Sequence, residues 1–343
     1  MRHACPVVLF FLVLLVLPGC LTSSGQSRPG LTDREMEIQR REAMAASALD
    51  KALQLHHNGE YLDEDMALDY LDEAIELDPD QVTARHLRAL LLLERGHLDE
   101  AEADARHALD IRPDHIQARF SLGYILYQRG AWAEAVREFS QVLERDDAVA
   151  EAFALRGTAY AQLGRADDAV HDFDRAIALN PAHFEAYYNR GLARLALGDD
   201  QEALHDLTQA LSLNSHSLPV LMARGALSMR LGDFDRAEAD YRRALVLSPS
   251  DSGLYALLAE ACAGGGDYPA ATDAARRAHG LARAEGDDRA ARVYEEQAGS
   301  YAGRPKVAPK PKPAPPPPPE PSPEDLPPDE SPSEAAPGEP VTP

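Results

Sequence analysis

Cysteine is scarce in this chain of 343 residues, which contains only Cys5, Cys20 and Cys262. Cys5 lies within an N-terminal segment that has the pattern of an export signal, and Cys20 follows the apolar run of that segment. Cys262 would then be the one unmodified thiol of the mature chain, so an intramolecular disulfide framework is excluded. We expect Cys262 to be a small buried side chain.

The sequence also lacks the motifs that carry common chemistry. It has no phosphate-binding glycine loop, no HExxH zinc motif, no GxSxG nucleophile turn and no dinucleotide fingerprint. Of 12 histidines only His56 and His57 are adjacent, and no cysteine or carboxylate has the spacing of a metal ligand around them. We therefore predict no catalytic residues, no bound metal and no cofactor, and we do not expect an enzyme.

Basic residues are too few to balance the acidic ones. The chain has 34 lysines and arginines against 57 aspartates and glutamates, a net charge of −23. An acidic surface repels nucleic acid and anionic lipid headgroups, so we expect neither as a partner. A basic partner remains possible, although solubility alone is also a sufficient reason for the negative net charge.

The sequence repeats itself at a step of 34 residues. Prolines or their replacements mark the step at Pro79, Pro113, Asp147, Pro181, Ser215 and Pro249. Alanines keep the same step at Ala67, Ala101, Ala135, Ala169, Ala203, Ala237 and Ala271. Glycines do so with one interval that is three residues longer, at Gly59, Gly96, Gly130, Gly164, Gly198, Gly232 and Gly266. A fixed period of this length predicts a solenoid.

Residues 150–183 show what one unit contains. Apolar residues recur at helical spacing on both sides of Gly164, which predicts two amphipathic helices joined by a short turn. Glycine can end the first helix in a left-handed conformation, and Pro181 cannot continue the second. Such a pair has no core of its own and must bury its apolar faces on the neighbouring pair.

These residues resemble the tetratricopeptide repeat. The places that define the family's pattern are filled by Gly157, Tyr160, Ala169, Phe173, Ala176 and Pro181. Seven units follow, at 45–81, 82–115, 116–149, 150–183, 184–217, 218–251 and 252–285. The resemblance implies an all-α, right-handed solenoid of these seven repeats (45–285), and the amphipathic residues 286–302 are expected to form a C-terminal capping helix.

Two departures from the family pattern are visible. Unit one has three extra residues near Tyr61, which predicts a longer turn between its helices. Arginines stand where the family often has leucine, and they are either solvated or form ion pairs between repeats: Arg88, Arg156, Arg190 and Arg224.

The N-terminus predicts export and lipidation. Val7–Leu17 is an apolar run of 11 residues, too short for a membrane span of ~20 residues but typical of a signal peptide. Residues 17–20 (Leu-Pro-Gly-Cys) resemble a bacterial lipobox, although Pro18 is unusual there. The resemblance implies a signal at 1–19, a lipid on Cys20 and, because Leu21 follows, a periplasm-facing position on the outer membrane. An ordinary cleaved signal peptide is the alternative.

Both ends of the repeat region carry further segments. Residues 20–44 comprise the lipidated cysteine, a tether and a helix-prone stretch that either caps the first repeat or folds back into the groove. Of 26 prolines, 17 lie in residues 303–343, so this tail is predicted to be disordered and extended. It is basic near Lys306 and acidic from Glu320 onwards, and serves either as a spacer or as a set of proline-rich docking segments.

The family binds partners in a concave groove lined by the first helix of each unit. The resemblance implies a partner-binding surface formed by Leu90, Leu93, Phe120, Tyr124, Tyr127, Tyr188, Leu192, Leu195, Met222 and Met229. The lysines with which one subfamily grips acidic peptides are missing from these places. An apolar, aromatic groove suits an amphipathic helix or an extended hydrophobic peptide. The alternative is that some of these residues pack between repeats.

We therefore expect a membrane-anchored scaffold that binds an envelope protein. Pilotin lipoproteins, which help secretins of type IV pili assemble, have a similar architecture, and so do adaptor lipoproteins that recruit peptidoglycan-remodelling enzymes. A third hypothesis is an accessory subunit that binds a small ligand, which would need an enclosed pocket with convergent polar groups. The sequence leaves the oligomeric state open.

Overall fold

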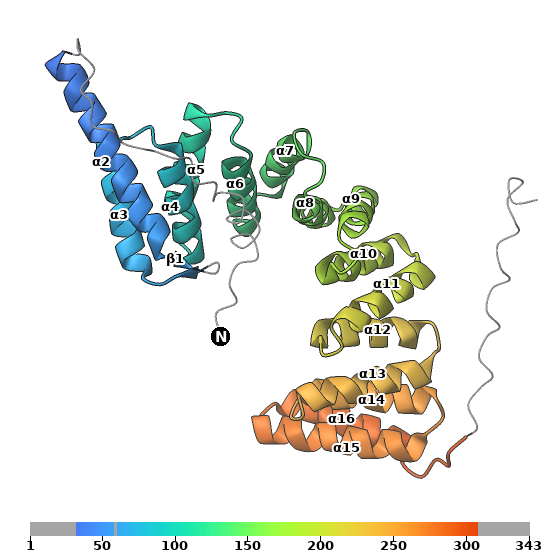
Figure 1. The fold of residues 1–343 in the computed structure, drawn as a ribbon. Coiled ribbons are helices and arrows are strands. Elements are labelled where there is room, and N and C mark those ends of the chain that lie inside the picture. Colours follow the sequence, from blue (N-terminus) through green and yellow to red (C-terminus); the bar gives the residue numbers. More distant parts are fainter. Residues whose placement is uncertain (1–31, 58–59, 308–343) are drawn as a thin grey trace, which may run out of the picture.

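The computed structural model describes residues 32–57 and 60–307, which fold almost entirely into helices (Figure 1). The helices are α2 (Asp33–Leu55), α3 (Glu64–Leu77), α4 (Val82–Glu94), α5 (Leu98–Ile111), α6 (Ile116–Gln128), α7 (Trp132–Leu143), α8 (Ala150–Gln162), α9 (Ala166–Leu179), α10 (Phe184–Leu197), α11 (Asp200–Leu213), α12 (Leu218–Arg230), α13 (Phe234–Leu247), α14 (Ser252–Gly264), α15 (Tyr268–Glu285) and α16 (Asp288–Tyr301). The only strands of the described residues are β1 (His56–His57) and β2 (Glu60–Tyr61), a short antiparallel hairpin.

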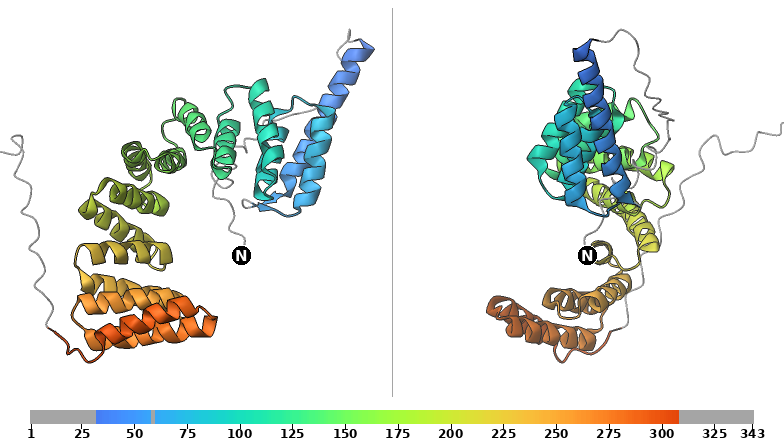
Figure 2. Two further views of the ribbon diagram at one scale, coloured as in Figure 1. Left: turned by 180° about the vertical axis from the view of Figure 1, so that it is seen from behind. Right: turned by 60° about the vertical axis from the view of Figure 1, so that its left-hand side comes forward.

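The helices pack as successive antiparallel pairs, from α2 with α3 to α14 with α15, and α16 covers the last pair. Neighbouring pairs stack side by side along an arc (Figures 1 and 2). The predicted all-α solenoid with a C-terminal capping helix is confirmed. The β1–β2 hairpin lies between the two helices of unit one, where the sequence has its extra residues.

In units two to seven, the turn between the two helices is closed by a glycine in the left-handed conformation. In unit four, Gly164 has φ of +74° and its N–H donates to the Ala161 carbonyl at 3.0 Å. The Arg165 N–H donates to the Tyr160 carbonyl at 2.9 Å, so the turn satisfies the carbonyls left open at the end of α8. This explains why glycine recurs at this place.

A second set of glycines lets the two helices of a unit approach closely. A Cβ built on Gly225 of α12 would lie 2.7 Å from the Tyr241 ring of α13, and one on Gly157 would lie 3.0 Å from the Phe173 ring. Real side chains do not tolerate such contacts without a shift, so the ring of the second helix lies directly on the backbone of the first. Gly123 with Phe139 and Gly191 with Leu207 repeat the arrangement.

The arginines that replace the family's leucine bind buried aspartates. Arg156 donates through Nε and a terminal nitrogen to both oxygens of Asp172, at 2.7 and 2.8 Å, and Asp172 is 1% exposed. Its other terminal nitrogen donates to Ser140 Oγ on α7 of the preceding unit, at 3.0 Å. A bidentate pair of this kind compensates for the removal of the carboxylate from water.

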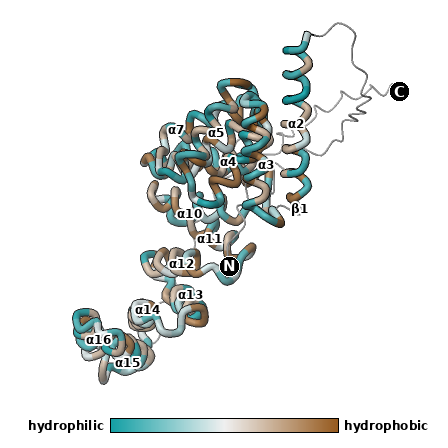
Figure 3. Tube along the Cα trace, turned by 90° about the vertical axis from the view of Figure 1, so that its left-hand side faces the viewer, coloured by the Kyte–Doolittle hydropathy of each residue, from teal (hydrophilic) through white to brown (hydrophobic). Residues whose placement is uncertain are grey.

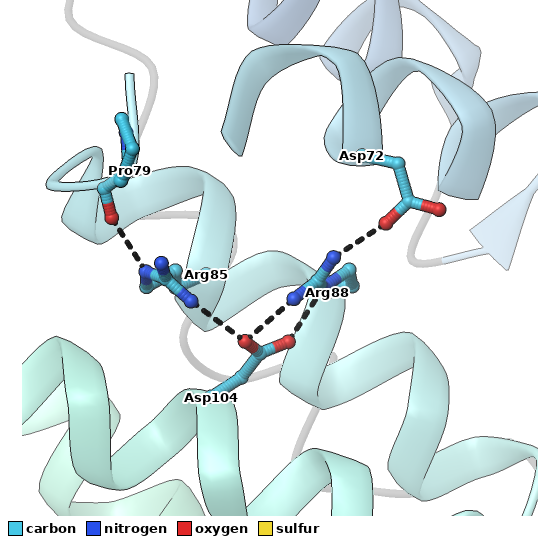
Figure 4. A network of polar contacts seen from close by, with 5 residues as sticks. All are labelled: Asp72, Pro79, Arg85, Arg88 and Asp104. Atoms are coloured by element: carbon cyan, nitrogen blue, oxygen red, sulfur yellow. Dashed lines mark hydrogen bonds and ion pairs between the residues drawn. The ribbon is translucent and has the colours of Figure 1, made fainter. Parts of the chain in front are cut away.

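The arrangement repeats with the same offset of 16 residues in both directions. Arg88, Arg190 and Arg224 bind the buried carboxylates of Asp104, Asp206 and Asp240 in their own units, and they also reach Asp72, Asp174 and Thr208 of the preceding units. Figure 4 shows the first network, in which Arg85 joins Asp104 to the Pro79 carbonyl. The solvated alternative is therefore wrong, and ion pairing between repeats is correct for Arg88 and Arg190. Arg156 and Arg224 reach the preceding unit through a hydrogen bond to a hydroxyl, and their ion pairs lie within their own units.

The N-terminal stretch differs from both alternatives offered by the sequence. Thr32 and Glu35 form a capping box at the start of the helix-prone stretch, but the helix that starts there runs without a break to Leu55 and is itself the first helix of unit one. Residues 33–44 are exposed, and this half of α2 projects beyond α3 (Figure 2) and consists mostly of hydrophilic residues (Figure 3). It neither caps the first repeat nor enters the groove.

Apolar burial is divided among three clusters. The first joins α2, α3 and α4, the second extends from α4 to α10, and the third extends from α11 to α16. Cys262 lies in the third, as expected, and burial raises the pKa of its thiol to about 11.

The predicted signal (1–19), Cys20 and the tail beyond Val307 lie outside the described residues. None of the described helices combines the length and apolar character needed to cross a bilayer.

Unit seven carries Leu258 and Ala274 where unit six carries Arg224 and Asp240, which suggests a matched test. Arg224→Leu alone should lower the free energy of unfolding by about 3 kcal/mol, because Asp240 is left as a buried, uncompensated carboxylate. The double variant Arg224→Leu/Asp240→Ala should recover most of that loss, since no unpaired charge remains. Urea unfolding of the two variants would measure the difference, and an equal loss in both would contradict this account.

Candidate partner-binding groove

The first helices of the units form the inner face of the arc. Helix α4 contacts α6, α6 contacts α8, and α8 contacts α10, so this face is continuous along the middle of the solenoid. The predicted binding residues come from these helices and from α12. Their exposure decides which of them a partner could touch.

Three of the predicted groove residues are buried and offer no surface. Phe120 is fully buried and packs its ring edge-on against Phe139, with centroids 5.5 Å apart. Leu90 and Leu93 are 5% and 8% exposed and belong to the apolar clusters between α4 and its neighbours. For these residues the prediction of an accessible groove position is wrong, because Phe120 packs within unit three and Leu90 and Leu93 are buried in the apolar clusters around α4.

Unit three presents an aromatic cluster. Tyr124 and Tyr127 lie half-buried with their rings stacked at 6.1 Å, and Trp132 packs edge-on against Tyr127 at 5.2 Å. Gln128 donates to the Tyr124 hydroxyl at 2.7 Å, which fixes that ring. Burial, followed by the charge of Glu151, raises the pKa of Tyr127, so its hydroxyl stays protonated at neutral pH.

A hollow of about 370 Å³ lies next to this cluster, between α8 and α10. The hollow is deep because unit four has alanine or threonine at the repeat positions where units three and five have tyrosine and leucine. The lining residues include Thr158, Ala161, Asp167, Asn189, Leu192 and Ala196. Asn189 donates to Thr158 Oγ1 at 3.3 Å, so one polar pair lies in a mostly apolar wall.

Units five and six continue the surface with apolar side chains. Leu192 and Met222 are 37% and 38% exposed. Tyr188, Leu195 and Met229 are half-buried and pack on the third apolar cluster. Seven of the ten predicted residues thus lie on an accessible inner face, while partner binding by them stays a prediction.

A histidine joins the two helices that enclose the hollow. His183 is 8% exposed at the start of α10, and its nitrogens lie 3.2 Å from Glu151 of α8 and 3.5 Å from Glu185. Burial lowers the pKa of His183, but hydrogen bonds to Glu151 and Glu185 outweigh that effect and raise the pKa to about 9. The imidazolium is therefore charged at neutral pH and connects units four and five.

Sequence reasoning missed four parts of this site: Trp132, Thr158, Asn189 and His183. Trp132 is the single tryptophan of the chain, which was a usable signal. Thr158, Asn189 and His183 give no signal by themselves, because their role depends on which side chains of the neighbouring repeat they meet. Among the described residues, no group of three or more histidines, cysteines or carboxylates could hold a metal ion.

Comparison with known families agrees with the repeat geometry. Four profiles described as "Tetratricopeptide repeat" match residues 70–103, 92–158, 154–215 and 219–251. The chain is a tetratricopeptide-repeat protein. No curated protein sequence matches it.

Solved structures place this tetratricopeptide-repeat protein among known solenoids. A tetratricopeptide repeat protein from Parabacteroides merdae is 18% identical, covers 78% of this chain and 99% of its own, and has a TM-score of 0.50. Pseudomonas aeruginosa pilF is 19% identical, covers 63% and 97%, and has a TM-score of 0.53. MamA is 22% identical, covers 50% and 94%, and has a TM-score of 0.47. At these identities the likeness concerns the fold.

The raised pKa of His183 makes the link between units four and five dependent on pH. The stabilisation is complete below the ordinary histidine pKa of about 6.5 and disappears as pH rises through 9. The variant His183→Gln should therefore lose up to about 3 kcal/mol at pH 6 and much less at pH 9.5.

Thermal or urea unfolding across this range would measure the effect. The matched control is His107→Gln, because His107 is exposed on α5. A difference between wild type and His183→Gln that does not change with pH would contradict the ion-pair account.

Proposed function

We propose that this tetratricopeptide-repeat protein is a non-catalytic scaffold that binds a segment of a partner protein on its inner face. The observation that carries the proposal is the surface from Tyr124 to Met229, where aromatic and aliphatic side chains flank the hollow between α8 and α10. Tyrosine and methionine suit contact surfaces because they combine large area with adaptability. An amphipathic helix or an extended apolar peptide would place one bulky side chain in the hollow.

A carboxylate at the hollow favours a partner with a basic residue beside its apolar ones. Asp167 lies at the lip of the hollow with an exposed side chain. Opposite charges at the rim of an interface raise the association rate and select the partner more than they raise affinity.

We further propose that the scaffold is tethered to the bacterial outer membrane through a lipid on Cys20 and faces the periplasm. The apolar run Val7–Leu17 and the Leu-Pro-Gly-Cys segment support this location. Several acyl chains would make the attachment stable, since each buried CH₂ contributes ~0.8 kcal/mol.

More specifically, we propose that the scaffold helps a secretin assemble in type IV pilus biogenesis. The likeness to Pseudomonas aeruginosa pilF is a likeness of fold, with 19% identity, so it makes this version consistent without selecting it. What favours it is the apolar inner face, which suits a hydrophobic segment of an outer-membrane subunit. A peptidoglycan-remodelling enzyme recovered as the partner would select the adaptor version instead.

Filling the hollow should abolish binding. Ala196 is exposed at its edge, so Ala196→Phe adds a ring there without disturbing the core. With a photo-crosslinking amino acid at Leu192, capture of the partner in intact cells should fall at least about tenfold, because a central contact of an interface is lost. Thermal unfolding should stay unchanged.

The matched control is Ala178→Phe, on the exposed side of α9 away from the hollow. It should leave capture intact, and a crosslinker at position 178 should capture nothing. Equal capture from both faces, or capture that survives Ala196→Phe, would show that the partner does not use the groove.

The anchor is tested independently of the groove. Cys20→Ala should move the protein from the membrane fraction to the soluble fraction of lysed cells, since no acyl chain can then be attached. Cys5→Ala, which changes the other N-terminal cysteine, should leave the distribution unchanged. Membrane association that persists in Cys20→Ala would overturn the lipoprotein proposal.

A further inference from the structure

Two histidines meet where unit two contacts unit three. His86 lies on α4 and is 3% exposed, and the centre of its ring lies 5.5 Å from the centre of the His115 ring. His115 directly precedes α6, and α6 contacts α4. Units one and two form one end of the arc (Figure 1), so the two rings lie in the contact that joins this end to the rest of the solenoid.

The surroundings of His86 require a neutral ring. Its Nδ1 is buried and has no hydrogen-bond partner among the described residues. A protonated imidazole carries an N–H on both nitrogens, and the new N–H would be buried here without an acceptor. Burial, followed by the charge of a protonated His115, lowers the pKa of His86 to about 3.

His115 must be neutral for a different reason. Its Nδ1 accepts a hydrogen bond from the Ala118 N–H at 3.1 Å and thereby caps the start of α6. An imidazolium donates from both nitrogens and cannot accept, so protonation would remove this cap. Burial and then the charge of Arg112 lower the pKa of His115, while its own backbone and the charge of Asp114 oppose them.

The charged side chains on the helices around α4 have other partners and do not compensate a proton on either ring. His115 is the one charged group that acts on His86. On the neighbouring helices, Asp72 of α3 and Asp104 of α5 bind Arg88, Arg119 of α6 binds Glu138, and on α2 Asp50 accepts from Gln54 while Lys51 lies over the Tyr70 ring.

The contact between units four and five has a histidine at the same repeat position with the opposite surroundings. His183 lies two repeats after His115, and its nitrogens lie 3.2 Å from Glu151 and 3.5 Å from Glu185. The matching places in units two and three hold Thr83 and Gln117. One repeat position therefore carries a charged histidine in one contact and a neutral histidine in the other.

We propose that the contact between units two and three is a joint that loosens in mild acid, because its closed form requires both His86 and His115 to be neutral. The contact between units four and five responds in the opposite direction, since His183 binds a proton more tightly between its two glutamates than in water. Loosening of the acid-sensitive joint would uncover Leu93, a predicted groove residue that the closed structure buries. The joint works in this way whether or not a partner occupies the groove.

Amide hydrogen exchange of the full chain at pH 7.5 and pH 5.5, corrected for the intrinsic exchange rate, tests the joint. Carboxylates with an ordinary pKa near 4 stay ionised in this window. Because a histidine in water has a pKa of about 6.5, the opening equilibrium constant should rise at least about tenfold between these pH values. The protection of the α4 amides and of the Ala118 amide should fall by the same factor.

The internal control is the Tyr187 amide, which donates to the His183 carbonyl. Its protection should rise by about tenfold over the same window, because the pKa of His183 is raised to about 9. Protection of α4 and Ala118 that stays constant or rises in acid would overturn the proposal.

A variant separates the two histidines from any general effect of acid. In His86→Met/His115→Asn, methionine has nearly the volume of histidine and stands at the same place in unit six as Met222, and asparagine keeps an acceptor for the Ala118 N–H. The pH dependence of protection at α4 and Ala118 should disappear, while that of Tyr187 should remain. An unchanged pH dependence at α4 in this variant would equally overturn the proposal.

Discussion

The short distance between the two helices of a unit governs the rest of the structure. Because Gly157 and Gly225 bring a first helix against the ring of the second, the arginine directly before each glycine can reach a carboxylate 16 residues later in its own unit. The same arginine also donates to the residue 16 positions earlier in the chain, which belongs to the preceding unit. Close packing within a pair thereby sets the contact between pairs, and the arc follows from repetition of both.

The inner face shows the opposite use of small residues. In unit four, Thr158 and Ala161 line the inner helix where the neighbouring units have larger side chains, and the missing volume becomes a hollow. Leu192 and Ala196 of α10 keep it apolar, while His183 connects the two helices that enclose it. A small side chain therefore has one of two effects, depending on its position within the repeat. It lets two helices pack closely, or it leaves a hollow on the inner face.

The period of 34 residues was sufficient to predict the all-α solenoid, because glycine turns and alanine contacts are local consequences of residue type. The division of the inner face into buried and accessible parts was not predictable in this way. Phe120 and Tyr124 are both aromatic residues of one helix, yet Phe120 faces Phe139 and Tyr124 faces the groove. The buried aspartates also escaped notice, although Asp172, Asp206 and Asp240 keep the same step as the arginines that bind them.

The division of apolar burial into three clusters bears on how the molecule responds to load. Cooperative opening follows contiguous buried area, so the clusters define blocks that can separate one at a time. At the boundary near α10, Tyr188 and Leu195 pack on the third cluster, and Arg190 and Arg194 bind Asp206 of α11, so apolar and ionic contacts together join the two blocks. A force that pulls the two ends of the solenoid apart would therefore lengthen the protein in steps, as one block after another separates from its neighbour.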